Sequence, residues 1–348
     1  MKNKNFERYD LELKKRIISA KFDKIIGQER VKKLVKTAIL SRRNIILSGP
    51  PGCGKTTLAR NIAETLPEIE LNNCPYHCDP NKPQCPECLA KIRRGEKPDT
   101  KIFLGAERFI RVQGSPDLTS EDLIGDIDPV KALKYGPASI EAFTPGKIFK
   151  ANYGILFFDE INRAPERIQN SLLQVLEENQ VTLSGYTINV PTNFILIGTM
   201  NPEDSSTEPL SEVFLDRFDI IEMDYPETTD IEVKIVKLKG KKFVEFPNHL
   251  LRETIQFVRN LRRNEKLSRK PSVRASIGIY ERAQANALLN GRKSVTLKDV
   301  EEILLSVLEH RISLKPSYKL EENKKDLIKR EFEKLKEAVG SGQPGDSV

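Results

Sequence analysis

The sequence predicts an α/β fold, in which an open parallel sheet of five strands carries helices on both faces and is followed by a smaller all-helical domain. Three observations favour this fold. Short apolar runs alternate with helical segments up to about residue 226, as a parallel sheet requires. A glycine-rich turn joins the first apolar run to a helix. Beyond residue 226, apolar positions recur only at helical spacing.

The composition suits a water-soluble chain with substantial cores. Hydrophobic residues make up 38% and charged residues 31% of the sequence. The length of 348 residues is enough for about two domains. No apolar run reaches the roughly 18 residues of a membrane span. The segment Met1–Phe6 is basic but lacks an apolar stretch behind it, so we expect no signal peptide and a cytoplasmic location. The net charge of +7 permits anionic partners without indicating nucleic acid.

Gly- and Pro-rich breaks and the spacing of apolar residues divide the chain into four parts. These are an N-terminal leader at 1–24, an αβα core at 25–226, a helical lid domain at 227–315, and a charged helix with a flexible tail at 316–348. The five expected strands are 44–48, 109–113, 154–160, 194–201 and 219–223. The main expected helices are 55–66, 165–179, 250–261, 272–289, 297–312 and 319–339.

The turn after the first strand has the G-x-x-x-x-G-K-[ST] spacing of a phosphate loop, from Gly49 to Thr56. Its glycines let backbone N–H groups approach phosphate oxygens, and the helix that starts at Lys55 directs its positive end at them. Lys55 adds a charge, and the Thr56 hydroxyl is placed to ligate Mg²⁺. We therefore predict an ATP site that includes Gly49, Pro50, Pro51, Gly52, Cys53, Gly54, Lys55, Thr56 and Thr57.

Polar side chains end the two later buried strands, where an α/β sheet binds its ligand. Asp159 is expected to hold Mg²⁺ and Glu160 to polarise the water that attacks the γ-phosphate. Asn201 could orient that water without competing for the metal. Taken alone, the two carboxylates would be a solvated strand end and Asn201 a turn residue before Pro202. The phosphate loop about 100 residues earlier favours the functional interpretation.

Four cysteines gather in a proline-rich stretch with the spacing Cys-x3-Cys-x6-Cys-x2-Cys. The stretch at 74–88 lacks periodicity, so we expect a loop on the surface of the core. Clustered thiols in an intracellular chain are typical of metal ligands, which predicts structural Zn²⁺ held by Cys74, Cys78, Cys85 and Cys88. Redox-active or free thiols are the alternatives, and His77 could replace one sulfur. Cys53, inside the phosphate loop, is not expected to be a ligand.

In combination, these motifs resemble AAA+ ATPases of the branch that contains MoxR and the magnesium-chelatase ATPase subunit (ChlI/BchI-like). The resemblance covers about residues 20–315. It rests on Ile25–Gln28 for the adenine pocket, Gly49–Thr56 for Walker A, Phe157–Glu160 for Walker B, Ile161–Pro165 with Gln169, Leu172, Leu173, Glu177 and Glu178 for a MoxR-like stretch, Thr199–Pro202 for sensor 1, Phe214–Asp219 for the arginine finger, Pro271–Ser276 for sensor 2, and Val307–Ile312 for the end of the lid.

The resemblance implies a homo-oligomeric ring, usually a hexamer, with Mg-ATP between neighbouring subunits. Ile26 and Gly27 would then contact the adenine. Arg217 would reach into the neighbour's site as a trans finger, and Arg274 would act in cis on the γ-phosphate. Arg163 and Arg167 are rival trans candidates. Without the resemblance, each arginine would be interpreted as an ordinary surface ion pair.

Two further segments match projections of this branch. The resemblance implies that 129–150 is the insert in helix 2 and that 181–190 is the hairpin before sensor 1. Their apolar or aromatic tips at Tyr135, Phe143 and Tyr186 would suit contact with a polypeptide, or would simply fill the subunit interface.

Three functions are compatible with such a ring. The first is a MoxR-like motor that remodels a protein substrate, with a von Willebrand A-domain (VWA) protein as partner. The second is the ATPase subunit of a chelatase that inserts Mg²⁺ or Co²⁺ into a tetrapyrrole with two further subunits. The third is a nucleic-acid motor, supported by the basic loop at 262–270 but opposed by a hairpin tip at 184–186 without Lys or Arg. We favour the first and expect no membrane or nucleic-acid partner.

Overall fold

The computed structural model describes residues 4–136, 139–182, 189–202 and 210–341, and its contacts divide the chain into two units. The first unit contains Met1–Ile25, Glu29–Gly49 and Gly54–Met223, and the second contains Ile26–Gln28, Pro50–Cys53 and Asp224–Val348. In the described part of the chain, no helix has the length and apolar character that a bilayer crossing needs.

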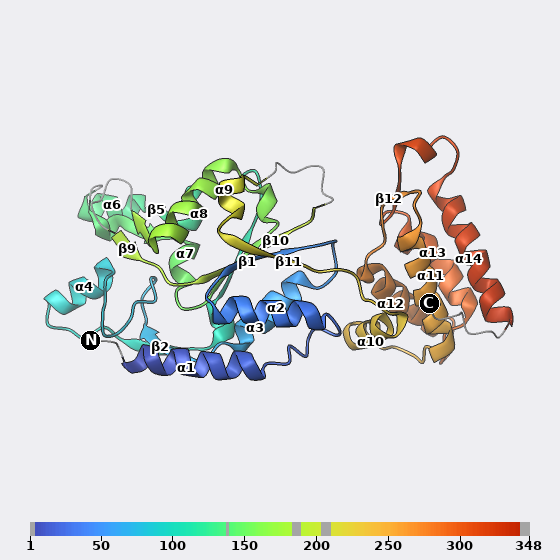
Figure 1. Ribbon diagram of the computed structural model, residues 1–348, viewed down its shortest axis with the longest axis horizontal. Helices are drawn as coiled ribbons and strands as arrows, with labels where there is room; N and C mark the ends of the chain where they lie inside the picture. The colour runs from blue at the N-terminus through green and yellow to red at the C-terminus, as the bar shows by residue number, and fades with distance from the viewer. Residues whose placement is uncertain (1–3, 137–138, 183–188, 203–209, 342–348) are drawn as a thin grey trace. The chain divides into compact units, whose positions relative to one another are not determined.

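The first unit is built on the predicted parallel five-stranded sheet, which is confirmed (Figure 1). The strands lie in the order β11-β1-β10-β7-β4, and each pairs in parallel with its neighbours. Their bounds are β1 (Asn44–Ser48), β4 (Phe109–Gln113), β7 (Ile155–Asp159), β10 (Ile195–Met200) and β11 (Phe218–Glu222).

Helices cover both faces of this sheet (Figure 1). One side carries α1 (Lys4–Ser19), α2 (Glu29–Leu40) and α3 (Lys55–Thr65), and the other carries α7 (Lys147–Lys150), α8 (Glu166–Glu178) and α9 (Glu212–Leu215). Because helices cover both faces, the central strands appear in the sequence as apolar runs. Ile155–Phe158 of β7, for example, are fully buried. The first unit also contains the short 3-10 helices η1 (Gly105–Arg108), η2 (Ile140–Ala142) and η3 (Ile161–Arg163), and the second unit contains η4 (Pro316–Tyr318).

The leader helix α1 packs on the first unit through one face. Leu13 and Ile17 are buried, whereas Leu11 and Ile18 are exposed. A fully buried arginine that the sequence did not single out joins this helix to the unit. Arg108 donates hydrogen bonds to the Tyr9 hydroxyl at 3.2 Å and to three main-chain carbonyls, so its charge is compensated by oxygen acceptors.

The cysteine-rich insert is not the surface loop that we predicted. It extends from an antiparallel ribbon of β2 (Ile69–Asn72) and β3 (Thr100–Phe103), and it contains the helix α4 (Pro86–Arg93). Cys85 and Cys88 are 0% and 2% exposed. The prediction was wrong because the cysteines pack into the hydrophobic core of the first unit, and such burial leaves no helical or strand period in the sequence.

The segment between β4 and β7 forms a small projection. It contains α5 (Ser120–Leu123), an antiparallel pair of β5 (Gly125–Ile127) and β6 (Phe143–Pro145), and α6 (Pro129–Tyr135) between them. Phe143 is not an exposed tip, because it is only 8% exposed and belongs to the core. Tyr135 is half exposed, and the apolar Val130 and Leu133 of the same helix α6 are exposed still further.

The expected hairpin before sensor 1 is present as an antiparallel pair of β8 (Gln180–Thr182) and β9 (Asn189–Pro191). Its tip, with Ser184, Gly185 and Tyr186, lies outside the described residues.

The second unit is helical, as predicted. Its helices are α10 (Thr229–Lys239), α11 (Asn248–Arg263), α12 (Val273–Leu289), α13 (Leu297–Leu308) and α14 (Lys324–Ser341), and β12 (Leu267–Arg269) pairs with β13 (Ser313–Leu314). The charged helix α14 belongs to its core, because Leu327, Ile328 and Phe332 are buried there. The sequence analysis missed α10, whose Val236 is fully buried.

The basic loop at 262–270 is exposed or half-buried over most of its length, but two of its residues are buried. Arg262 is 7% exposed and Leu267 is 1% exposed. Arg262 donates two hydrogen bonds of 2.9 Å to the Glu232 carboxylate, which is itself fully buried. Arg259 and the Ser276 hydroxyl also donate to that carboxylate. Burial alone would raise the pKa of Glu232, but these partners hold it below its usual value.

This buried ion pair predicts a large loss of stability on neutralisation. Glu232→Gln leaves the Arg262 guanidinium buried without its counter-charge, so we expect the free energy of unfolding of the second unit to fall by roughly 3–5 kcal/mol. Urea unfolding at neutral pH, followed by circular dichroism, measures this change. Because folding lowers the pKa of Glu232, its stabilisation is present above its usual pKa of 4.5 and disappears as the pH falls below that value.

A matched control is Arg252→Ala. Arg252 pairs with Asp230 at the surface of the same unit, where both side chains are about half exposed. Its removal is expected to cost less than about 1 kcal/mol. An equal loss in the two variants would contradict the importance of the buried pair.

Candidate functional site: a nucleotide-binding edge

The candidate site lies where the central strands end. Parallel pairing places Ser48 opposite Met200, and Gln113 opposite Asp159. The backbone N–H of Gly49 donates to the Met200 carbonyl at 3.1 Å. The phosphate loop after β1 and the polar residues after β4, β7 and β10 therefore share one edge of the sheet, as the sequence predicts.

Local backbone geometry shapes the phosphate loop. Gly52 and Gly54 have φ of 77° and 109°, a region that side chains disfavour, so glycine is needed at both positions. α3 begins at Lys55 directly after Gly54. The Lys55 ammonium donates to the Gly49 carbonyl at 2.5 Å, which holds its charge over the loop. Backbone N–H groups, the helix N-terminus and this ammonium together favour an anion.

Asp159 is the best-supported carboxylate of the site. The Thr199 hydroxyl donates to its Oδ1 at 2.7 Å and accepts from the backbone N–H of Glu160 at 2.9 Å. The Arg111 guanidinium donates to its Oδ2 at 2.6 Å. Thr199 therefore fixes Asp159 and the backbone that carries Glu160. The sequence analysis placed Thr199 in sensor 1 without giving it a role, and it did not identify Arg111.

Glu160 is held in an unusual conformation. Its backbone is left-handed, with φ 54° and ψ 51°, and such positions are concentrated at functional sites. Gln113 donates to its Oε2 at 3.1 Å, and Arg163 pairs with the same oxygen at 3.3 Å. A Cβ at Gly114 would lie 2.0 Å from the Glu160 carbonyl oxygen, so only glycine allows this approach. Gln113 and Gly114 were missed, although their place at a strand end was a signal.

Oxygen donors at this edge fit Mg²⁺, which prefers carboxylate, hydroxyl and water ligands. The Asp159 carboxylate is largely buried, with 16% of its side chain exposed, and Thr56 lies in the first turn of α3. Asn201 follows the last residue of β10 on the same edge. These residues could hold the metal and orient water.

Arg217 lies at the other end of the strands, where β1 and β11 begin. It directly precedes β11, whose first residue Phe218 pairs with Asn44, the first residue of β1. The phosphate loop follows the last residue of β1, and five residues of strand span roughly 16 Å. Arg217 donates hydrogen bonds to Glu177 and to the Val213 carbonyl, and about a third of its side chain is exposed.

The rival arginines lie elsewhere. Arg163 pairs with Glu160 of its own chain at 3.3 Å, so it belongs to the cis site. Arg167 of α8 donates a hydrogen bond at 3.5 Å to the carbonyl of Leu118, which lies in the segment between β4 and β7.

The second unit carries the remaining predicted residues. Gly27, next to Ile26, has φ of 71°, and a Cβ there would lie 3.4 Å from Ile231. Arg274 is exposed in the first turn of α12. Its Cγ lies 3.5 Å from a Cβ built on Gly52, which the contacts assign to the same unit.

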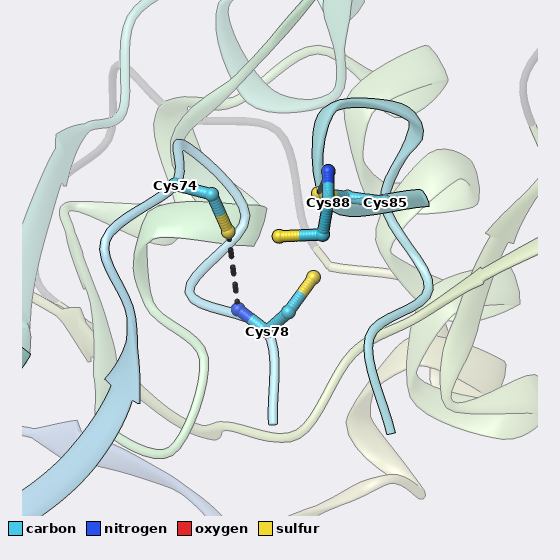
Figure 2. Close-up of side chains that lie close together, drawn as sticks. All are labelled: Cys74, Cys78, Cys85 and Cys88. Atoms are coloured by element: carbon cyan, nitrogen blue, oxygen red, sulfur yellow. Dashed lines mark hydrogen bonds between the residues drawn. The ribbon is translucent and has the colours of Figure 1, made fainter. Parts of the chain in front are cut away.

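The four cysteines of the insert also come together (Figure 2). All four sulfurs lie within 4.8 Å of one another. Within the part of the chain that the structure describes, His77 is not a member of this cluster, since its ring packs on Phe103 with a centroid distance of 4.4 Å. The suggestion that His77 replaces a sulfur is therefore wrong.

The fold and the site define the class of protein, an ATPase of the AAA+ type. Three family models match consecutive parts of the chain. They are the magnesium chelatase subunit ChlI model at residues 21–75, the AAA_3 model of the ATPase family associated with various cellular activities at 102–220, and the AAA lid domain at 261–331.

Curated relatives define the family more closely. The magnesium-chelatase subunit ChlI homolog of Methanocaldococcus jannaschii is 34% identical over 338 residues, which cover 88% of this chain and 89% of the relative. The ChlI subunit of Synechocystis is 28% identical, with 91% and 95% covered. The chain belongs to the family of magnesium-chelatase ChlI subunits and their homologues. A cryo-EM-based structure of the BchI–BchD complex of magnesium chelatase aligns with a TM-score of 0.48 at 23% identity, with 85% and 96% covered.

The hydrogen bonds of Thr199 generate a prediction. Thr199→Val keeps the shape but removes the hydroxyl that orients Asp159, so we expect kcat for ATP hydrolysis to fall by about 10–100-fold and the Mg²⁺ requirement to rise. Thr199→Ser retains the hydroxyl and should restore most of both. Steady-state ATPase assays over a Mg²⁺ titration measure the effect. Equal activity of the valine and serine variants would show that the hydroxyl is not needed.

Proposed function

We propose that this protein is the ATPase subunit of a chelatase that inserts Mg²⁺ or Co²⁺ into a tetrapyrrole. It would act as a homo-oligomeric ring, six subunits by the AAA+ pattern, together with further chelatase subunits. The observation that carries the proposal is the 34% identity to a ChlI homolog, which extends over nearly nine-tenths of both chains. The match of residues 21–75 to the ChlI model supports the same assignment.

This proposal has better support than the MoxR-like remodelling motor that we favoured from the sequence, for which a VWA-domain partner was expected. ChlI subunits and a ChlI homologue are among the relatives that extend over most of the chain. The basic loop supports the nucleic-acid motor less than its composition suggests, because Arg262 is buried in an ion pair with Glu232.

In the proposed mechanism, each residue at the strand ends has one role. Lys55 and the backbone N–H groups of the phosphate loop bind the β- and γ-phosphates. Asp159 and Thr56 would hold Mg²⁺, which supplies charge neutralisation of the phosphate oxygens when bound. Glu160 orients and polarises the attacking water, and Asn201 fixes its position. Gln113 holds the Glu160 carboxylate at this edge through a bond of 3.1 Å.

The position of Arg217 supports action on a neighbouring subunit. It stands at the edge where the strands begin, roughly 16 Å of strand away from its own phosphate loop. A head-to-tail ring joins two different surfaces of neighbouring subunits, so it can place the start of these strands in one subunit against the nucleotide site of the next. Arg217 would then stabilise charge on the transferred phosphoryl group of its neighbour. Arg163 is a poorer candidate because it already pairs with Glu160 of its own chain.

A complementation experiment distinguishes trans from cis action. Glu160→Gln should bind ATP and hydrolyse it at least about 10³-fold more slowly, and Arg217→Ala should lose a similar factor. If Arg217 acts in trans, mixing the two inactive variants regenerates intact sites, at roughly a quarter of the interfaces in a random equimolar ring. ATPase assays on mixed and unmixed variants measure this recovery.

Failure of the mixture to recover, with ring assembly verified by light scattering, would contradict trans action. Arg163→Ala serves as the matched comparison. Because Arg163 contacts the cis Glu160, its mixture with Glu160→Gln should stay inactive.

The chelatase role is tested by reconstitution. Tagged Glu160→Gln with ATP should retain the partner subunits from the native cell. Wild-type protein added to the purified partners should then drive ATP-dependent metal insertion into a tetrapyrrole, followed by its absorbance change, whereas Glu160→Gln should not. Recovery of a VWA-domain protein without a tetrapyrrole-binding subunit, and without metal insertion, would instead favour the remodelling motor.

A further inference from the structure

The insert between β2 and β3 contains a second candidate site, away from the nucleotide edge. Cys74 and Cys78 follow β2, and Cys85 and Cys88 flank the first turn of α4. Figure 2 shows the sulfurs of the two pairs directed toward a common centre. The six residues between Cys78 and Cys85 form the turn that brings the two pairs together.

The spacing of the sulfurs fits a single metal ion. A tetrahedral zinc site with Zn–S bonds of about 2.3 Å has sulfurs about 3.8 Å apart. The four sulfurs here all lie within 4.8 Å of one another, so small side-chain adjustments complete the tetrahedron. In a polynuclear iron–sulfur cluster the thiolates bind different iron atoms and stand further apart. A disulfide would join two sulfurs at about 2.05 Å, whereas these four cysteines are free.

Hydrogen-bond donors directed at the sulfurs are an independent observation. The backbone N–H of Cys78 donates to the Cys74 sulfur, and that of Cys88 donates to the Cys85 sulfur, each at 3.4 Å. The Asn72 amide donates to the Cys88 sulfur at 3.5 Å. Such donors orient ligands and compensate the negative charge that four thiolates place on a metal.

The environment of the cluster indicates a structural rather than a catalytic ion. Cys78, Cys85 and Cys88 are buried, and four sulfurs leave no coordination position for substrate. Between the cysteines, Tyr76 packs on Phe149 with a centroid distance of 4.9 Å, and Asn152 donates to the Tyr76 carbonyl at 2.9 Å. A metal that joins the two cysteine pairs therefore also fixes the insert on the first unit.

We propose that Cys74, Cys78, Cys85 and Cys88 bind one structural Zn²⁺ ion that joins the two ends of the insert and holds it on the sheet domain. This site is independent of nucleotide hydrolysis and of the chelatase assignment. The zinc it holds would be resident and distinct from the metal that a chelatase inserts.

Metal analysis of the full-length protein tests the proposal. Untagged wild-type protein should contain about one zinc ion per chain after exhaustive dialysis. Cys85→Ser/Cys88→Ser should contain less than about 0.2. Cys53→Ser is the matched control, because Cys53 lies in the phosphate loop outside the cluster, and it should keep its zinc. Wild-type protein with iron in place of zinc, or with no bound metal, would overturn the proposal.

A thiol assay keeps the test valid if the double variant does not fold. In the wild-type protein, zinc should shield four of the five cysteines from a thiol reagent, and a strong chelator should expose all five. Zinc readdition should restore the shielding. Five thiols that react equally before and after chelation, or disulfides detected by mass spectrometry in freshly purified protein, would refute the site.

Discussion

The parallel pairing of five strands is the constraint on which the nucleotide site depends. Its register places the ends of β1, β4, β7 and β10 on one edge, so residues more than 150 positions apart become neighbours. The Gly49–Met200 hydrogen bond and the Thr199–Asp159–Glu160 contacts are consequences of that register. A slip by one residue would reverse every side chain and separate these groups.

Elements with strong local signals could be predicted from the sequence. The five strands and the phosphate loop were placed to within one or two residues, and the signal is strongest for β1, β7 and β10, which are buried on both faces and appear as continuous apolar runs. The insert could not be predicted, because Cys85 and Cys88 are buried in a core formed with residues that are distant in the sequence. Arg262 looked solvated for a similar reason, since its partner Glu232 lies 30 residues earlier and no local pattern links the two. At the nucleotide edge, Asp159 and Glu160 were visible as a motif, whereas Gln113 depends on strand pairing.

Polar groups buried in the two units are stabilised in different ways. In the second unit, Glu232 receives hydrogen bonds from Arg259, Arg262 and Ser276, so charge pairing compensates burial. In the insert, four cysteine sulfurs face one another within a hydrophobic core, and as thiolates they could not compensate one another's charge. In the proposed site a divalent cation would do so, as the two arginines do for Glu232.

In the proposed mechanism, the same register that gathers one half of the nucleotide site leaves the other half to a neighbouring subunit. Lys55, Asp159 and Glu160 gather at the edge where the strands end, but Arg217 is fixed at the edge where they begin. No rotation of a side chain covers a distance of roughly 16 Å of strand. An arginine that serves this chemistry from such a position must therefore serve another copy of the chain. The orientation of the sheet thus favours head-to-tail assembly, in which each subunit contributes one edge to each of two sites.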